Sequence, residues 1–190
     1  MTRPAGSTAV LMRITYLRIV LVPAVMACIL AGDDVDGAYV TGATLFVVAA
    51  GTDFVDGFLA RRWRLTTTLG SFLDTTADKL LVSGALVALV AVGRASPWAA
   101  TIVVGRELLI MGLRGVVASG GEVVPPSIWG KLKATVQFVA IGLAIVRVED
   151  EIGPLHLDEY AMLAAVVVTI MSAVEYLSRY ASALKSDAPR

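Results

Sequence analysis

The sequence predicts an all-α integral membrane protein with six transmembrane helices and both termini in the cytoplasm. Three observations support this fold class. The 190-residue chain is 57% hydrophobic and only 17% charged, and its mean hydropathy of +0.77 lies outside the usual range for soluble domains. It contains six apolar runs of about 17 to 25 residues, the length that crosses a bilayer. Its basic residues gather in every second connection between these runs.

The six runs follow one another with short connections rich in Gly, Asp, Pro or Ser. The first follows Arg13 and contains Cys28, the only cysteine; a lone thiol in an apolar helix suits packing, and we favour a first span over a signal peptide. The second and third runs form a hairpin around the basic turn "RRWRLTTT". In chain order the predicted spans are residues 14–31, 38–60, 69–92, 97–118, 128–146 and 160–182, within one membrane domain over residues 1–190.

Charge along the chain sets the expected topology. Formal net charge is zero, so overall charge indicates no partner, and we expect no nucleic-acid partner. One set of connections, "GDDVDG", "GRAS" and "RVEDEIGPLHLDEY", holds only Arg94 and Arg147 as basic residues. The other side receives Arg3, Arg13, Arg61, Arg62, Arg64, Lys131, Lys133, Lys185 and Arg190. By the positive-inside rule, the protein is a multi-pass protein of the cell membrane whose basic side faces the cytoplasm.

Four carboxylates lie among these apolar segments, within "GTDFVDGFLARRWRLTTTLGSFLDTTADKLL". Residues at helical spacings of three, four, seven and eight share one face. One such face carries Asp53, Asp56, Gly57, Ala60 and Arg61, and a second, on the next helix, carries Gly70, Asp74 and Asp78. Because the two helices run in opposite directions about the basic turn, both faces are expected to meet near the cytoplasmic boundary.

Carboxylates grouped at the edge of a bilayer need neutralising charge. Oxygen ligands at this density suit hard divalent cations, most simply two Mg²⁺ ions, with Mn²⁺ as the alternative. Salt bridges with Lys79 and Arg61 are a second explanation, and an ion pathway is a third. A divalent-cation transporter would carry polar residues through to the outer face, whereas "AYVTGATLFVVAA" and "VSGALVALVAV" hold almost nothing ionisable. That pattern favours a site open to the cytoplasm over a transporter or a non-catalytic scaffold.

The spacing Asp53-x2-Asp56-Gly57-x2-Ala60-Arg61-x8-Gly70-x3-Asp74-x3-Asp78 resembles the signature of the CDP-alcohol phosphotransferases, a family of membrane enzymes. The segment "ITYLRIVLVP" resembles the family's first helix, with Thr15 and Arg18 in the usual relation. Met12 stands where the relatives usually carry Asn. "GRELLIMGLR" and "GKLKATVQFVAIGL" are similar to the fourth and fifth helices of the phosphatidylglycerophosphate synthase branch.

The resemblance implies the six-helix fold of this family, a homodimer, and displacement of CMP from a CDP-linked lipid by the hydroxyl of a second alcohol. It makes Asp53, Asp56, Asp74 and Asp78 metal ligands for two ions, and Asp78 also the general base. It assigns binding of the CDP-lipid to Thr15, Gly57, Ala60, Arg61, Thr67 and Gly70.

The acceptor implied by this branch is glycerol 3-phosphate, which CDP-diacylglycerol would convert to phosphatidylglycerophosphate. Such an acceptor requires a basic pocket reached from the cytoplasm. The candidates are Arg106, Arg114, Lys131 and Lys133, although surface anchoring of the lysines at the membrane is an alternative. A cardiolipin synthase with phosphatidylglycerol as acceptor is the second possibility, and a phosphatidylinositol-phosphate synthase the third.

Overall fold

The computed structural model describes residues 7–63, 68–119, 128–147 and 151–186; within these ranges it leaves out the side chains of residues 7–11, 53–63, 68, 69, 71, 119, 128, 131, 151, 152 and 181–186. The described chain is all-α apart from one short hairpin, β1 (Glu151–Ile152) paired antiparallel with β2 (Leu155–His156). The helices are α1 (Ser7–Leu30), α2 (Ala38–Trp63), α3 (Thr68–Ala91), α4 (Pro97–Ser119), α5 (Ile128–Val146) and α6 (Leu157–Ser186).

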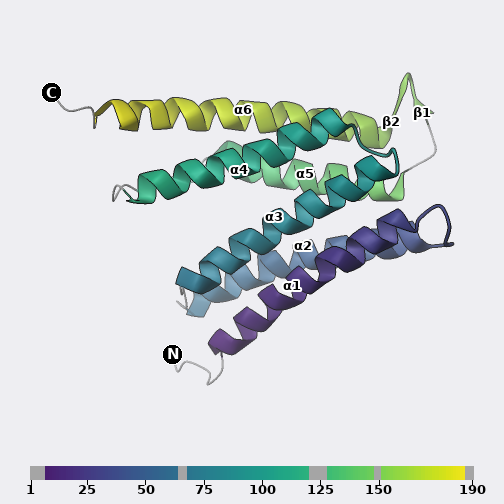
Figure 1. The fold of residues 1–190 in the computed structure, drawn as a ribbon, viewed down its shortest axis with the longest axis horizontal. Helices are drawn as coiled ribbons and strands as arrows, with labels where there is room; N and C mark the ends of the chain where they lie inside the picture. The colour runs from purple at the N-terminus through teal and green to yellow at the C-terminus, as the bar shows by residue number, and fades with distance from the viewer. Residues whose placement is uncertain (1–6, 64–67, 120–127, 148–150, 187–190) are drawn as a thin grey trace.

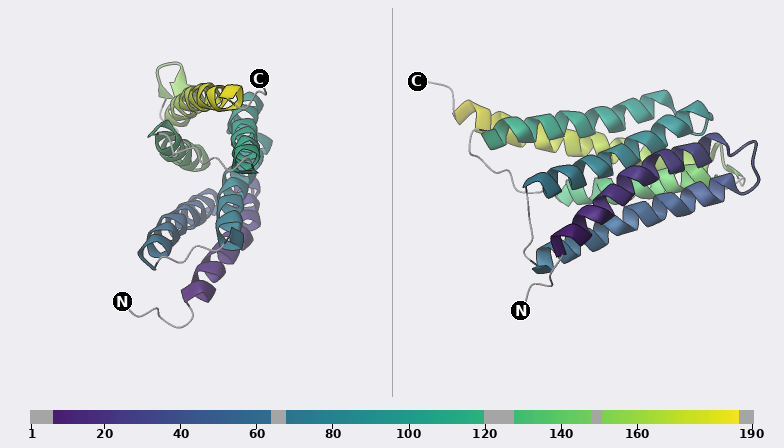
Figure 2. Two further views of the ribbon diagram at one scale, coloured as in Figure 1. Left: turned by 90° about the vertical axis from the view of Figure 1, so that its left-hand side faces the viewer. Right: turned by 60° about the horizontal axis from the view of Figure 1, so that its bottom comes forward.

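The helices form two groups that spread apart at one end (Figure 1). Helix α1 packs along both α2 and α3, whereas α2 and α3 meet over only a short stretch. Helix α6 packs against α5 and α4. The two groups separate where α1, α3 and α5 begin and come together at the opposite end, and a second view shows the same fan (Figure 2). We call the end where the two groups separate the open end, and the end where they meet the closed end.

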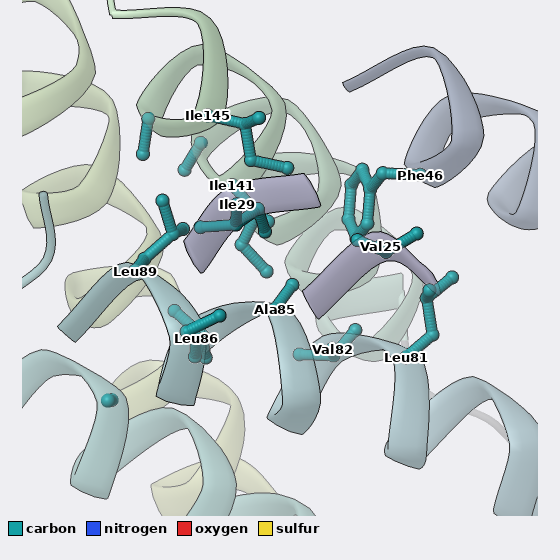
Figure 3. Close-up of a cluster of buried hydrophobic side chains, with 14 of the residues drawn as sticks. Val25, Ile29, Phe46, Leu81, Val82, Ala85, Leu86, Leu89, Ile141 and Ile145 are labelled. Atoms are coloured by element: carbon teal, nitrogen blue, oxygen red, sulfur yellow. The ribbon is translucent and has the colours of Figure 1, made fainter. Parts of the chain in front are cut away.

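A hydrophobic core fills the closed end. Phe46 of α2 and Ile141 of α5 are buried together with side chains from α1 and α3 (Figure 3). The core residues on α3, from Leu81 to Leu89, all follow Asp78 in the chain. A smaller cluster packs α4 against α6 near the open end, formed by Ile110, Val117, Tyr176 and Tyr180. Among the described residues, the main apolar core therefore fixes the helices at one end and does not extend along α3 as far as Asp78.

Turn chemistry explains the junction between α3 and α4. Gly93 has a φ of 69°, and Arg94 N–H donates to the Leu89 carbonyl at 2.8 Å while Gly93 N–H donates to Val90 at 3.2 Å. This pair of bonds is the Schellman end of a helix, which needs a left-handed residue such as glycine. Pro97 then begins α4, at the position where its missing N–H costs nothing.

The outward surface of the helices is strongly apolar, while charged side chains lie inside. Trp98 is 79% exposed, and large apolar side chains point outward from every helix, among them Val20, Val47, Phe72, Val87, Leu108, Val139 and Val174. Arg18, Arg106, Glu107 and Lys133 are buried. A soluble domain shows the reverse distribution, so this surface suits lipid.

Two stretches in the described residues are long and apolar enough to cross a membrane, Met12–Leu30 and Leu157–Tyr180, and shorter apolar helical stretches cover Ala38–Thr52 and Leu132–Val146. Every predicted span corresponds to a helix: residues 128–146 match α5 at both ends, while α1 begins seven residues before residue 14. That all six helices cross the bilayer, and that residues 1–190 form one domain, stay predictions.

Candidate active site

Asp74 and Asp78 lie one turn apart on α3, on the face predicted from their spacing, and both side chains are partly exposed. Asp74 accepts a hydrogen bond at 3.1 Å from the guanidinium of Arg18, which is only 1% exposed. The Nε atom of Arg18 also donates to the Ala49 carbonyl of α2 at 3.2 Å. One buried guanidinium on α1 thus joins α2 to α3 and fixes the position of Asp74.

Asp78 is connected to a second group of charges through its neighbour Lys79. The ammonium of Lys79 lies 3.0 Å from Asp78 Oδ2 and 2.6 Å from Glu107 Oε2 on α4. Lys133 of α5 donates to the other oxygen of the same carboxylate, Glu107 Oε1, and Arg106 Nη1 lies 3.2 Å from that oxygen. Ion pairs therefore run from the aspartate face of α3 across to α4 and α5.

These charges line a cavity of ≈ 240 Å³ between α3, α4 and α5. The sequence predicted three of the basic residues, Arg106, Arg114 and Lys133, for one pocket, and the structure places all three on this cavity. Lys133 is 4% exposed, which rules out anchoring at the membrane surface as its role. The described residues that line the cavity are Thr75, Lys79, Arg106, Glu107, Ile110, Met111, Arg114, Gly130, Lys133 and Ala134.

Two side chains of α6 accept hydrogen bonds from the two arginines that line this cavity. Arg106 Nη2 donates to the Ser172 hydroxyl at 2.7 Å. Arg114 Nε donates to the Tyr176 hydroxyl at 3.0 Å, and the Arg114 guanidinium lies 5.0 Å from the centre of that ring. These contacts restrict two long side chains whose freedom would otherwise oppose ligand binding.

The remaining predicted site residues divide into those the structure describes and those it does not. Thr15 is buried on α1, one turn before Arg18, and Gly70 lies one turn before Asp74 on α3. Residues 53–61 belong to α2, but the structure does not describe the side chains on its predicted site face, which are those of Asp53, Asp56, Gly57, Ala60 and Arg61. The side chain of Lys131 and the whole of Thr67 are also outside the described part. Their assigned roles stay predictions.

Asp74 and Asp78 offer oxygen donors of the kind that a divalent cation takes, and they are the two predicted metal ligands whose side chains are described. Among the described side chains, no three His, Cys, Asp or Glu residues come together. Both aspartates are carboxylates, the preferred donors of Mg²⁺ and Mn²⁺, and both share one helix face. Arg18 pairs with Asp74 and Lys79 pairs with Asp78. Their positive charges neutralise the two carboxylates, as a bound metal ion would.

The sequence did not predict the polar residues that support the cavity. Glu107 of α4 and Ser172 and Tyr176 of α6 are not among the predicted site residues. A buried acid within an apolar helix was the available signal for Glu107. Ser172 and Tyr176 gave none, since their partners lie 66 and 62 residues away.

Comparison with known proteins identifies the family. A family model described as CDP-alcohol phosphatidyltransferase matches residues 12–171. The chain is 39% identical over 186 residues to a CDP-diacylglycerol--glycerol-3-phosphate 3-phosphatidyltransferase of Bacillus subtilis, covering 92% of this chain and 96% of the relative. An Escherichia coli K12 protein of the same name is 42% identical over 145 residues, covering 72% and 76%.

A further relative, a probable phosphatidylglycerophosphate synthase of Mycobacterium tuberculosis, is 38% identical over 168 residues, covering 87% of this chain and 78% of that protein. These matches cover most of the chain, and the family match, which reaches from α1 into α6, includes the aspartate spacing and the cavity residues on α3, α4 and α5. They confirm the family resemblance of the sequence. The chain belongs to the CDP-alcohol phosphatidyltransferase family and is an enzyme of that type.

Proposed function

We propose that the protein transfers the phosphatidyl group of CDP-diacylglycerol to glycerol 3-phosphate, giving phosphatidylglycerophosphate and CMP. The relatives' names support both substrates. The observation that supports the proposal is the ion-pair path from Asp78 through Lys79 to the basic cavity, because Asp78 belongs to the signature and the cations of the cavity suit a phosphorylated acceptor.

The reaction forms one P–O bond and breaks another. The acceptor hydroxyl attacks the phosphorus of the phosphatidyl group, the diphosphate bond to CMP breaks, and CMP leaves with the electron pair. Asp78 accepts the hydroxyl proton as general base. Arg61 binds a phosphate of the donor, and Gly57, Ala60 and Gly70 leave space for the nucleotide, with Thr15 and Thr67 as hydroxyl contacts.

Two divalent cations, Mg²⁺ with Mn²⁺ as an alternative, are the cofactors in this proposal, held by Asp53, Asp56, Asp74 and Asp78. When bound, they supply positive charge to the diphosphate and the leaving CMP. Arg18 positions Asp74 for this role through its contact at 3.1 Å. Removal of divalent ions by a chelator should abolish CMP release, and Mg²⁺ should restore it; CMP release that continues without divalent ions would contradict the metal assignment.

The charge of the cavity favours a small phosphorylated acceptor. Four cations and one carboxylate line its described part, a formal excess of three positive charges. A phosphomonoester carries a charge of about −1.5 to −2 at neutral pH, whereas the phosphodiester of phosphatidylglycerol carries one. The cavity residues Arg106 and Arg114 of α4 and Lys133 of α5 therefore bind the acceptor phosphate, together with Lys131 of α5.

The apolar helix surface supports a multi-pass cell-membrane protein with both termini and the active site at the cytoplasmic side. The open end carries Arg13 of α1, Arg114 of α4 and Arg179 of α6, and it faces the cytoplasm, where glycerol 3-phosphate is soluble. Surrounding lipid presents the CDP-diacylglycerol directly to the same end. The enzyme works as a homodimer, as the family resemblance implies; sizing in detergent against the monomer of 19.9 kDa tests this.

One experiment separates the candidate acceptors. Purified protein receives CDP-diacylglycerol and Mg²⁺, with glycerol 3-phosphate, phosphatidylglycerol or inositol phosphate offered separately, and CMP release is followed. We expect release with glycerol 3-phosphate. Release with phosphatidylglycerol alone would instead support a cardiolipin synthase. An absence of release with every acceptor would contradict the proposal.

A further inference from the structure

Glu107 is the most heavily paired carboxylate in the described part of the chain. It is 3% exposed, yet three cations from three helices contact it: Lys79 of α3 at 2.6 Å, Arg106 of α4 at 3.2 Å, and Lys133 of α5. Burial of an ionised group is costly unless opposite charges and hydrogen bonds compensate it. Here both carboxylate oxygens are satisfied, and the carboxylate is stable only with its cations in place.

The position of one of these cations, Lys133, in turn depends on Glu107. Ser172 holds Arg106 and Tyr176 holds Arg114, but among the described residues Lys133 has Glu107 as its one partner. Lysine side chains are long and flexible, so an ammonium without such an anchor would sample many positions. Glu107 therefore decides where the Lys133 charge lies in the cavity.

Donor groups remain free for a ligand in this arrangement. Each lysine ammonium has three N–H donors, and Lys133 uses one of them on Glu107. The buried Nε of Arg106 has no hydrogen-bond partner within the described residues. Buried donors without partners are rare in folded proteins, and they are expected where a ligand supplies the acceptor oxygen. Arg106 and Lys133 both line the cavity, so its wall contains side chains whose donors are not all used by described residues.

We propose that Glu107 is a positioning residue for the acceptor phosphate. It holds Lys133, Arg106 and Lys79 around the cavity, and through Lys79 it connects the acceptor site to Asp78. The proposal rests on the proposed function, since it gives the cavity the acceptor as ligand. Glu107 touches none of the reacting atoms itself; it acts through the cations that bind the phosphate.

The test measures KM for both substrates in Glu107→Gln, which removes the negative charge and keeps the shape. We expect KM for glycerol 3-phosphate to rise about tenfold or more, the effect of losing hydrogen bonds to charged groups. KM for CDP-diacylglycerol should stay near the wild-type value. A purely structural role would lower the melting temperature without separating the two KM values. Wild-type KM for the acceptor in Glu107→Gln would overturn the proposal.

A double-mutant cycle with Lys133→Gln shows whether Glu107 acts through that lysine. If part of the effect of Glu107 passes through Lys133, the pair of substitutions should raise KM for the acceptor by less than the product of the two single effects, because residues in one network are not additive. Fully additive effects would contradict the proposed route. Glu175→Gln is the matched control: Glu175 on α6 pairs with Arg179 at 2.6 Å, away from the cavity lining, and its loss should leave both KM values unchanged.

Two further measurements keep the test decisive. If Glu107→Gln does not accumulate as folded protein, Glu107→Asp keeps the charge on a shorter side chain. A raised acceptor KM in that variant supports the proposal, and an unchanged one overturns it. Inorganic phosphate should also raise the melting temperature of the wild type and not that of the variant. This readout needs no turnover, so a wild type that releases no CMP would overturn the proposed function separately from Glu107's role.

Discussion

At the scale of single residues, the site consists of charges that are held before any substrate arrives. Arg18 is fixed by a carbonyl of α2 and by Asp74, and Arg114 by Tyr176. Preorganised charges need little rearrangement when a charged substrate binds or when charge develops during reaction. The same principle predicts that loss of one supporting side chain weakens the binding of one substrate and not of the other, since each supporting side chain positions a different charge.

Asp78→Asn should lower kcat by about 100-fold or more, because general-base catalysis contributes that much and an amide accepts no proton at neutral pH. Lys79 keeps its contact with Glu107 in this variant, so the basic cavity should remain formed. CMP release under saturating substrates measures the effect. Asp34→Asn serves as control, since Asp34 is exposed in the turn between α1 and α2 at the closed end. Near-normal turnover of Asp78→Asn would remove Asp78 from the role of base.

Tyr176→Phe should raise KM for glycerol 3-phosphate several-fold and leave KM for CDP-diacylglycerol unchanged. The substitution removes the hydroxyl that Arg114 Nε contacts at 3.0 Å, while the ring keeps its packing on Tyr180. Steady-state kinetics with each substrate varied in turn measures this. Tyr16→Phe is the matched control, because Tyr16 is exposed on α1. An equal effect on both KM values would mean that Tyr176 supports the fold and not the acceptor site.

The sequence predicted part of this site for a clear physical reason. Asp74 and Asp78 share a helix face because four residues make about one turn, and that relation depends only on local geometry. The partners of Arg106 and Arg114 on α6 depend on how helices pack, which no local spacing encodes. Family resemblance supplied the roles of the aspartates; the supporting residues required the three-dimensional arrangement.

At the scale of elements, α1 organises the half of the molecule that carries the aspartates. It packs along α2 and α3, and small residues bring the backbones close. A Cβ added at Gly42 would lie 3.1 Å from Cys28 Cβ, and one at Gly84 would lie 2.9 Å from Val22 Cγ1 and 3.0 Å from Met26 Sδ. The α1–α3 contact at Gly84 therefore has no room for a side chain.

Gly84→Ala should destabilise the protein by about 1 to 3 kcal/mol, the usual cost of overpacking, because Val22 is β-branched and cannot turn aside easily. Thermal unfolding in detergent should show a lower melting temperature. Gly142→Ala is the matched control: Gly142 lies within α5, and an added Cβ there would meet no atom within 4 Å. That change should be neutral or slightly stabilising, since alanine favours a helix. Equal melting temperatures for both variants would contradict the close packing of α1 on α3.

The predicted helix starts agree best with the structure where Gly, Ser or Pro residues mark the boundary. Ala38, Pro97 and Ile128 begin helices as expected, since Gly, Ser or Pro residues precede or form these starts. The start of α1 at Ser7 was missed because the prediction counted apolar residues only, whereas a helix also continues through Arg13. The hairpin of β1 and β2 was missed as well, although Gly153, with a φ of 74°, provides its turn. Apolar length locates a buried stretch and does not locate the ends of the helix around it.

At the scale of the whole molecule, the main apolar core and the candidate active site lie toward opposite ends. The main apolar core lies at the closed end, whereas Asp74 and Asp78 lie in the half of α3 that begins at the open end. At the closed end, Arg94 donates to the Ile145 carbonyl at 2.8 Å and lies 3.4 Å above the Tyr39 ring, which ties three segments together. Concentrating stability at one end leaves the other available to a water-soluble acceptor and a lipid donor at the same time.

This division predicts the orientation of the protein in the cell membrane. In a Cys28→Ala background, Asp34→Cys places a thiol in the closed-end turn and Ala118→Cys places one near the open end of α4, both at exposed positions. A membrane-impermeant thiol reagent added to intact cells should label the first and should label the second only after lysis, because the positive-inside rule puts the open end in the cytoplasm. The reverse pattern would place the active site outside, and equal labelling of both in intact cells would contradict a membrane-spanning arrangement.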